Sequence, residues 1–197
     1  MPSFAFYADA ALTVPLSTWT RFHTTDGALD PVDKQIWFGS TDGTKKAQAS
    51  SNPGVDQIAV SIGYVYPARA NLEAVTAGEK RRLSTSNNRI YEAQGNGTTA
   101  SSPPTFPTNI NDTVVDGSVT WKTIAYEDTA DELKLAADSA SLGAATAGAP
   151  LNLGVTIIGG SANAATFWAR ATDPDMVVQT TTQLKLVIST INESAYP

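Results

Sequence analysis

The segment QIAVSIGYVY (57–66) restricts the fold of this chain more than any other stretch. Large apolar or aromatic side chains occupy every second position, and the positions between them are small, polar or β-branched. A β-strand places alternate side chains on the same face, so this spacing predicts a strand with one buried face. The apolar positions in step are Ile58, Val60, Ile62, Tyr64 and Tyr66.

Similar strand signals recur on both sides of this segment, separated by short stretches rich in turn-forming residues. Residues 131–145 combine strand and helix spacing, so we expect a strand there that runs into one helical turn. We interpret 41–56 as turns without a strand. Many short strands predict an all-β fold, a β-sandwich of the immunoglobulin-like or jelly-roll-like kind with at most one short helix. The other expected strands lie in 4–8, 18–24, 34–40, 151–158, 165–172 and 182–190.

The middle of the chain differs from its two ends. Residues 68–127 are polar and rich in turns, with strand signals only in 88–94 and around a hairpin at Asp116-Gly117. We therefore predict a discontinuous sandwich body, 1–67 and 128–197, interrupted by an inserted module, 68–127, that stands out from the body.

The inserted module is expected to hold itself together. Three prolines, at 103, 104 and 107, restrict the chain that leads to the hairpin, which lowers the entropy lost on folding. Tyr91, Phe106 and Trp121 are expected to form a miniature core.

Composition excludes several classes of protein. The net charge is −6, which argues against nucleic-acid binding, and the cluster EKRR (79–82) is predicted to be a solvated loop or turn. Cysteine is absent, so disulfides, thiolate chemistry and cysteine zinc sites are excluded. Charged residues make up 16% of the chain, below the ~25% typical of globular domains, as is common where neighbours cover much of the surface.

No membrane or export segment is expected. The uncharged span 139–169 is interrupted by Pro150, glycines and polar residues, so it predicts two short strands rather than a membrane helix. The N-terminal residues lack a basic stretch followed by an apolar one, so no export signal is predicted.

Enzyme signatures are nearly absent. His23 is the only histidine, and a place on a strand face is favoured over a catalytic role. The motif GNGTTA (95–100) is followed by prolines rather than a helix, which argues against a phosphate site. Two carboxylate pairs could contribute to a calcium site, but turn hydrogen bonding is favoured. We therefore predict no catalytic, cofactor or metal residue and no cofactor; the two pairs are Asp112 with Asp116 and Asp173 with Asp175.

The aromatic residues are the remaining functional candidates, because exposed aromatic rings can stack on sugars. Core packing is favoured for most of them, since aromatic side chains bury a large area each. For Phe106 and Trp121, a ligand-facing platform is kept as an alternative. The full set of candidates is Trp19, Trp37, Trp121, Trp168 and Phe106.

The segment from Tyr91 to Trp121 resembles a small module found repeatedly in proteins of tailed-bacteriophage particles. The shared pattern is a strand with an aromatic residue, a Gly/Thr/Ser loop, P-x-aromatic-P, and T-V-x-D-G-S/T-V-T-W. Here it reads Tyr91, GNGTTASSPP, PTFP and TVVDGSVTW, with Phe106 where tryptophan is common. The flanking sequences FAFYADAALTVPL, NPGVDQIAVSI and AGAPLNLGVTIIGGSANAATFWARATD are also similar to sandwich-type virion proteins.

This resemblance implies a non-enzymatic virion structural protein, assembled in the host bacterial cytoplasm. A capsid decoration or cement protein is favoured, docked on the head lattice as a homo-oligomer, with a trimer expected. Its partners would be the major capsid protein or tail proteins. The alternative is a baseplate- or fibre-associated protein that contacts a host glycan or receptor, and a glycan-active enzyme is the remote alternative. Neither nucleic-acid binding nor membrane insertion is implied.

Overall fold

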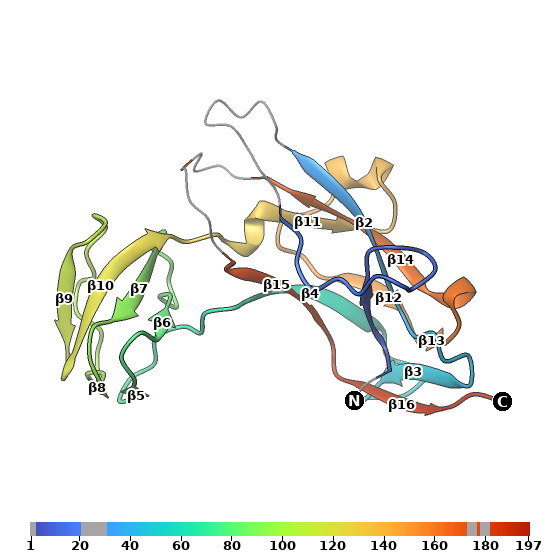
Figure 1. Ribbon diagram of the computed structural model, residues 1–197, viewed down its shortest axis with the longest axis horizontal. Coiled ribbons are helices and arrows are strands. Elements are labelled where there is room, and N and C mark those ends of the chain that lie inside the picture. Colours follow the sequence, from blue (N-terminus) through green and yellow to red (C-terminus); the bar gives the residue numbers. More distant parts are fainter. Residues whose placement is uncertain (1–2, 21–30, 173–176, 178–181) are drawn as a thin grey trace. The chain divides into compact units, whose positions relative to one another are not determined.

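The computed structural model of the protein describes residues 3–20, 31–172, 177 and 182–197 (Figure 1). Strands account for 44% of the residues and helix for 6%, so the predicted all-β class is confirmed. Within the described ranges, helix is limited to three 3-10 segments of three or four residues. These are η1 (Ala130–Glu132), η2 (Ala140–Gly143) and η3 (Ser161–Asn163).

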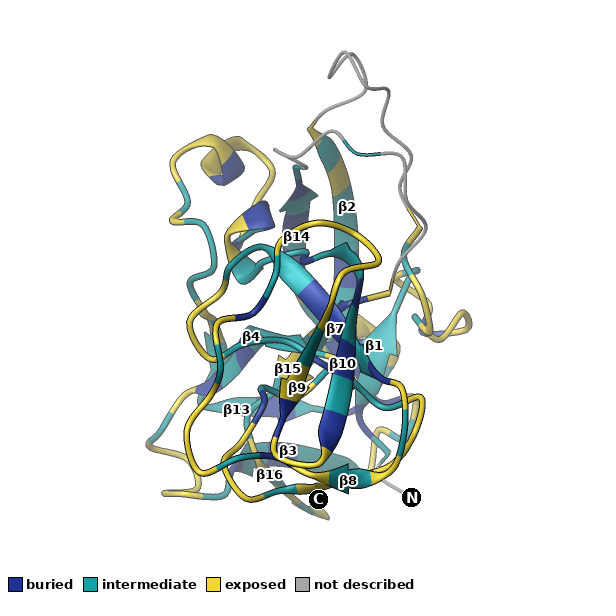
Figure 2. Ribbon diagram, turned by 90° about the vertical axis from the view of Figure 1, so that its left-hand side faces the viewer, coloured by how far each residue is buried: buried dark blue, intermediate teal, exposed yellow. Residues whose placement is uncertain are grey.

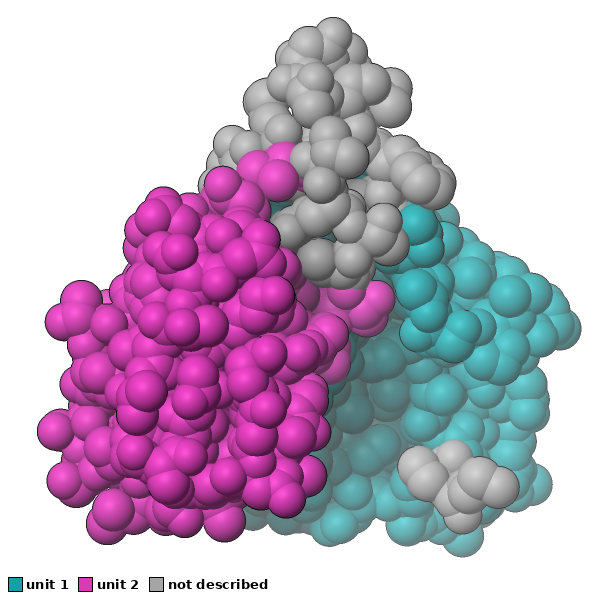
Figure 3. Space-filling view, turned by 60° about the vertical axis from the view of Figure 1, so that its left-hand side comes forward, with its two compact units in different colours: residues 1–63, 130–176, 185–197 teal, residues 64–129, 177–184 magenta. Residues whose placement is uncertain are grey.

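The chain divides into two compact units, coloured separately in Figure 3. Unit 1 consists of 1–63, 130–176 and 185–197, and unit 2 consists of 64–129 and 177–184. The sequence-based boundaries placed an inserted module at 68–127 and assigned everything after it to the body. In the structure, unit 2 also includes 64–67, 128–129 and 177–184, and the backbone N–H of Val65 donates to the carbonyl of Gln183 (2.7 Å).

Unit 1 is a β-sandwich. One sheet has the order β1-β2-β14-β11 and the facing sheets have the orders β12-β4-β15 and β13-β3-β16. The first sheet consists of β1 (Ala5–Tyr7), β2 (Val32–Gly39), β11 (Leu133–Ala136) and β14 (Ala165–Ala171). The others consist of β3 (Lys45–Ala49), β4 (Ile58–Tyr64), β12 (Leu151–Gly154), β13 (Thr156–Ile158), β15 (Leu184–Ile188) and β16 (Ile191–Ala195).

The body core lies between these sheets. Ile36 and Phe167, from the first sheet, are fully buried and pack in one cluster with Val60 of β4. Burying an aromatic or branched aliphatic side chain stabilises the folded state by roughly 1.5–3 kcal/mol, so this alternation of apolar residues accounts for much of the driving force. In β4, however, full burial is confined to Ile58 and Val60, and the later positions are only partly buried.

Two strands of the body were not predicted. β3 lies inside the stretch interpreted as turns, and β16 follows the last expected strand. β3 buries only small side chains, Ala47 and Ala49, and Lys, Gln and Ala are all depleted in strands. β16 is an edge strand with alternating polar residues.

Three further expectations concern unit 1. Residues 18–20, expected at the start of a strand, lie outside any strand, and 21–24 fall outside the described residues. The span 139–169 holds β12 and β13 on either side of Val155 and most of β14, where two strands were predicted. No helix among the described residues is long and apolar enough to cross a membrane.

Unit 2 is built on a four-stranded sheet of order β6-β7-β10-β9. Along β10, buried residues alternate with less buried ones (Figure 2). A two-stranded pair, β5-β8, completes the unit. The strands are β5 (Ala74–Val75), β6 (Lys80–Arg81), β7 (Arg89–Ala93), β8 (Gly97–Thr98), β9 (Thr113–Asp116) and β10 (Val119–Tyr126).

The predicted hairpin and miniature core are both present. Asp116 pairs with Val119, so the loop has two residues, and Gly117 at its first position has φ +66°. That conformation suits glycine, and a Cβ at Gly117 would lie 2.3 Å from the carbonyl oxygen of Thr98. The predicted aromatic trio belongs to one buried cluster, in which the ring centroids of Tyr91 and Phe106 are 4.7 Å apart.

Candidate functional site

The carboxylate of Asp116 lies at the centre of unit 2 and is completely buried. Arg69 donates two hydrogen bonds to this carboxylate, from Nε to Oδ2 (2.9 Å) and from Nη2 to Oδ1 (2.7 Å). The backbone N–H of Ala100 donates to Oδ1 (2.9 Å), and Nε1 of Trp121 donates to Oδ2 (3.1 Å). We call these four residues the Asp116 lock.

The lock keeps Asp116 ionised. Burial alone would raise the pKa of this carboxyl, but the hydrogen bonds from Arg69, Ala100 and Trp121 together with the charge of Arg69 hold it below its usual value. The Arg69 guanidinium also donates to the carbonyl of Ala100 (2.7 Å) and to the side-chain oxygen of Asn71. Both oxygens of Asp116 accept hydrogen bonds, and Nε, Nη1 and Nη2 of Arg69 all donate within unit 2. The arrangement therefore stabilises the fold of this unit.

The structure overturns two site alternatives. Asp116 does not serve as a calcium ligand with Asp112, because its oxygens accept the hydrogen bonds of the lock. Asp112 is exposed, and its Oδ2 accepts from Nδ2 of Asn109 (3.0 Å). Among the described residues, no three acidic or histidine side chains gather as a metal site would require. Phe106 and Trp121 cannot form a ligand-facing platform, because their exposed fractions are 8% and 0%.

The basic cluster 79–82 is not the solvated loop that was predicted. Arg81 is buried on β6, with Nη2 3.0 Å from Glu73 and 2.7 Å from Glu79. Arg82 lies with its guanidinium carbon 3.7 Å from the ring centroid of Tyr64. These arginines therefore help to hold unit 2 together instead of forming a basic surface.

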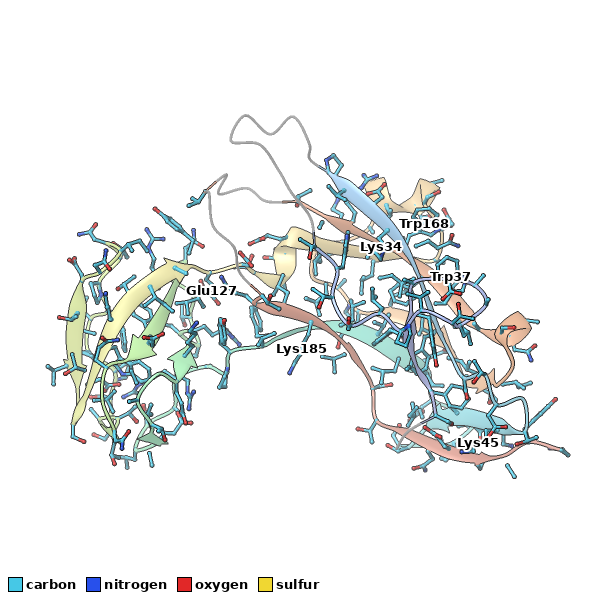
Figure 4. The ribbon with its side chains drawn as sticks, in the orientation of Figure 1. Lys34, Trp37, Lys45, Glu127, Trp168 and Lys185 are labelled. Atoms are coloured by element: carbon cyan, nitrogen blue, oxygen red, sulfur yellow. The ribbon has the colours of Figure 1, made fainter. Side chains whose placement is uncertain are left out.

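The side chain of Glu127, labelled in Figure 4, is a second buried carboxylate, and it accepts fewer hydrogen bonds than that of Asp116. Its Oε2 accepts from the hydroxyl of Ser86, while its Oε1 lies 3.9 Å from Nη1 of Arg82 and accepts no hydrogen bond from the described residues. Nε of Arg82 and Oδ1 of Asn87 are likewise buried without a hydrogen-bond partner in that part of the chain. Burial raises the pKa of Glu127 above its usual value, although Ser86 and Arg82 act in the opposite direction.

We expect Glu127→Gln to stabilise the protein at about pH 7 by on the order of 1 kcal/mol and to leave it unchanged near pH 4. When folding raises the pKa of a carboxyl, its contribution to the free energy of unfolding is fully present below the unfolded pKa of about 4.3. That stabilising contribution is lost as the pH rises through the folded pKa. Urea unfolding at both pH values measures the difference. Glu92→Gln, on partly exposed Glu92, is the control, and equal destabilisation by Glu127→Gln at both pH values would contradict the expectation.

The outer strand of unit 2 has an open edge (Figure 1). Since Asp116 forms the hydrogen-bonded pair next to the turn, the backbone groups of Thr113 and Val115 point away from β10. Among the described residues, none forms a hydrogen bond to these groups. Val115 is 65% exposed, although proteins usually protect such edges with charges or proline. We call Thr113–Asp116 the hairpin edge.

The other sequence candidates are scattered. His23, Asp173 and Asp175 lie outside the described residues. Trp19 is partly buried against the body core, as was favoured. Trp37 and Trp168 lie on neighbouring strands of the body and remain partly exposed (Figure 4).

Comparison with known proteins identifies no relative at a significant level: no family model, curated protein or solved structure matches the chain. The site residues that sequence reasoning missed are Arg69 and Glu127. No local pattern marks either of them, because each acquires its role from partners more than 40 residues away in the sequence.

Proposed function

We propose that the protein is a non-enzymatic structural component of a tailed-bacteriophage particle, and more specifically a decoration protein on the capsid lattice. The observation that carries this proposal is the P-x-aromatic-P and TVxDGSVTW pattern, together with what its residues do. Asp116 and Trp121 belong to the lock, Gly117 makes the turn, and Phe106 packs in the core. A pattern whose members stabilise one small unit suits a module that is reused for its shape.

The hairpin edge supplies a means of attachment. A strand from a neighbouring protein can pair with the outward backbone groups of Thr113 and Val115, and the exposed Val115 side chain can add apolar contact. We propose the major capsid protein as the neighbour, with several copies of this chain, three in the favoured arrangement, around each docking position on the virion.

A second candidate function is a tail-associated protein that contacts host glycans. The observation that favours it is the pair of partly exposed tryptophans on the body, Trp37 and Trp168, rather than any residue of unit 2.

Cryo-electron microscopy of the particle that carries this protein is the direct test. We expect density on the head in a fixed ratio to the major capsid protein. Particles that lack the protein should recover this density when purified wild-type chain is added. Density restricted to the tail at low copy number would overturn the decoration assignment.

The role of the hairpin edge is tested in the same add-back assay. We expect Val115→Lys to weaken particle binding by about tenfold or more, because a charge on the edge opposes strand pairing. Val55→Lys is a matched control, since Val55 is 66% exposed and lies in unit 1. Equal binding by the two variants would exclude the hairpin edge as the attachment site.

A further inference from the structure

The outer face of the first body sheet carries a group of aromatic and polar side chains. In the strand register, Tyr7 of β1, Trp37 of β2 and Thr166 of β14 form one row across the sheet. Gln35 and Trp168 are paired in the next row, so the two tryptophans are diagonal neighbours on one face. The Cα atoms of such diagonal neighbours are roughly 7–8 Å apart. We call these five residues the aromatic face.

The aromatic face is not part of the core. The residues between them in sequence, such as Ile36, Phe38 and Phe167, point the other way and are buried to 1% exposure or less. Neither Tyr7, Trp37 nor Trp168 belongs to a buried cluster of the described residues or packs against one. An apolar sandwich face normally supplies the core, so two tryptophans on the opposite face need another explanation.

The polar side-chain atoms of the aromatic face lack partners within the described part of the chain. Among the described residues, none forms a hydrogen bond with the indole N–H of either tryptophan, the amide of Gln35, or the hydroxyls of Tyr7 and Thr166. In the same part of the chain, neither indole ring stacks on another aromatic ring or on a cation. The face therefore offers two partly exposed indole rings beside uncharged donors and acceptors.

Neighbouring elements limit the extent of the face. At one end, a Cβ on Gly39 would lie 3.1 Å from Leu12 Cδ1, and Leu12 is buried. At the other end, Arg170 and Asp33 form a bidentate ion pair, from Nε to Oδ1 (2.7 Å) and from Nη2 to Oδ2 (2.8 Å). Beside β11, Nζ of Lys134 donates to the carbonyl of Gly143 in η2 (3.1 Å). The side chains of the aromatic face therefore lie between Leu12 at one end of the sheet and the Asp33–Arg170 ion pair at the other.

We propose that the aromatic face binds a carbohydrate of neutral hexopyranose units. One side of a pyranose ring presents C–H groups and suits an indole ring, while its rim presents hydroxyls that both donate and accept hydrogen bonds. Trp37 and Trp168 then stack against two sugar units, and Gln35, Tyr7 and Thr166 bind their hydroxyls. At the end of the face, Asp33 and Arg170 are paired with each other, and Nζ of Lys134 is bound to a carbonyl oxygen, so a neutral saccharide suits the face better than a phosphorylated or strongly acidic one.

The test is a glycan array of bacterial surface oligosaccharides probed with the full chain, followed by titration of each array-positive sugar using tryptophan fluorescence. We expect binding by the wild-type chain and a loss of affinity of about tenfold or more for Trp37→Ala and for Trp168→Ala. Trp37→Phe and Trp168→Phe, which keep a ring, should retain part of the affinity. Circular dichroism verifies that every variant is folded.

Tyr196→Ala is the matched control, because Tyr196 is an exposed aromatic residue at 38% that is not part of the face. Absence of binding by the wild-type chain, or unchanged binding by both tryptophan→alanine variants, would overturn the proposal. Loss of capsid binding by these variants without any sugar binding would also overturn it and assign the face to a protein partner. Because capsid attachment is assayed separately through Val115, failure here leaves the decoration proposal standing.

Discussion

Replacing Arg69 by methionine is expected to lower the free energy of unfolding of unit 2 by about 3–5 kcal/mol. The substitution removes the guanidinium and leaves the Asp116 carboxylate at 0% side-chain exposure with only the N–H groups of Ala100 and Trp121 as donors. An uncompensated buried charge is among the most costly defects that a single substitution can create. Since small domains are stable by only about 5–15 kcal/mol, this change removes a large part of the total.

Urea unfolding followed by tryptophan fluorescence measures this loss, because Trp121 lies in the lock. The double variant Arg69→Met/Asp116→Leu removes both charges, so we expect it to be more stable than Arg69→Met alone. Asp112→Ala is the control on the same hairpin, since Asp112 is exposed, and it should change stability by no more than about 0.5 kcal/mol. If Arg69→Met and Asp112→Ala had the same small effect, the lock would not be the main stabilising feature of unit 2.

The acid limb of the stability curve gives an independent readout of the lock. The pKa of Asp116 is lowered by folding, so its contribution is present above the unfolded pKa of about 3.9 and is lost as the pH falls through the folded pKa. Glu127 has the opposite sign, because its pKa is raised. The two carboxylates therefore give unit 2 a stability that declines toward strong acid through Asp116 and declines from mildly acidic toward neutral pH through Glu127.

Local pattern was sufficient to predict the fold class and several elements. Alternating apolar residues identified β4, and Asp-Gly between two arms of β-branched residues identified the β9–β10 hairpin. β3 was missed because its buried side chains are Ala47 and Ala49, whose burial contributes too little apolar area to produce a recognisable alternation. There, pairing with β13 and β16 determines the strand more than local propensity does.

Side-chain roles were harder to predict than strands. Trp121 and Trp37 have the same residue type and lie in similar strand sequences, yet one is fully buried and the other is partly exposed. The two residues differ in their surroundings. Trp121 belongs to the buried core of unit 2 and donates to Asp116, whereas Trp37 lies on the outer face of the body sheet. Such partners are set by register and by contacts distant in sequence, which a local pattern does not contain.

Paired substitutions in the two cores test whether the units unfold independently, and we expect each to cost about 3–5 kcal/mol. Trp121→Ala creates a cavity in unit 2 and removes one donor to Asp116, while Phe167→Ala creates a cavity in the body core. Both side chains are completely buried in the native chain, so the two changes are matched in burial and differ mainly in location. If each unit is a cooperative domain, each variant should shift its own transition and leave the other in place.

Differential scanning calorimetry, together with hydrogen exchange read out by mass spectrometry on peptides from 64–129 and 130–172, separates these outcomes. In Trp121→Ala, we expect faster exchange in the first peptide set and unchanged exchange in the second, with the reverse pattern in Phe167→Ala. The body would then fold from segments on both sides of an independently stable unit, as the insertion hypothesis requires. A single transition shifted equally by both variants, with exchange accelerated throughout, would instead mean that the chain folds as one cooperative domain and that unit 2 depends on the body for its stability.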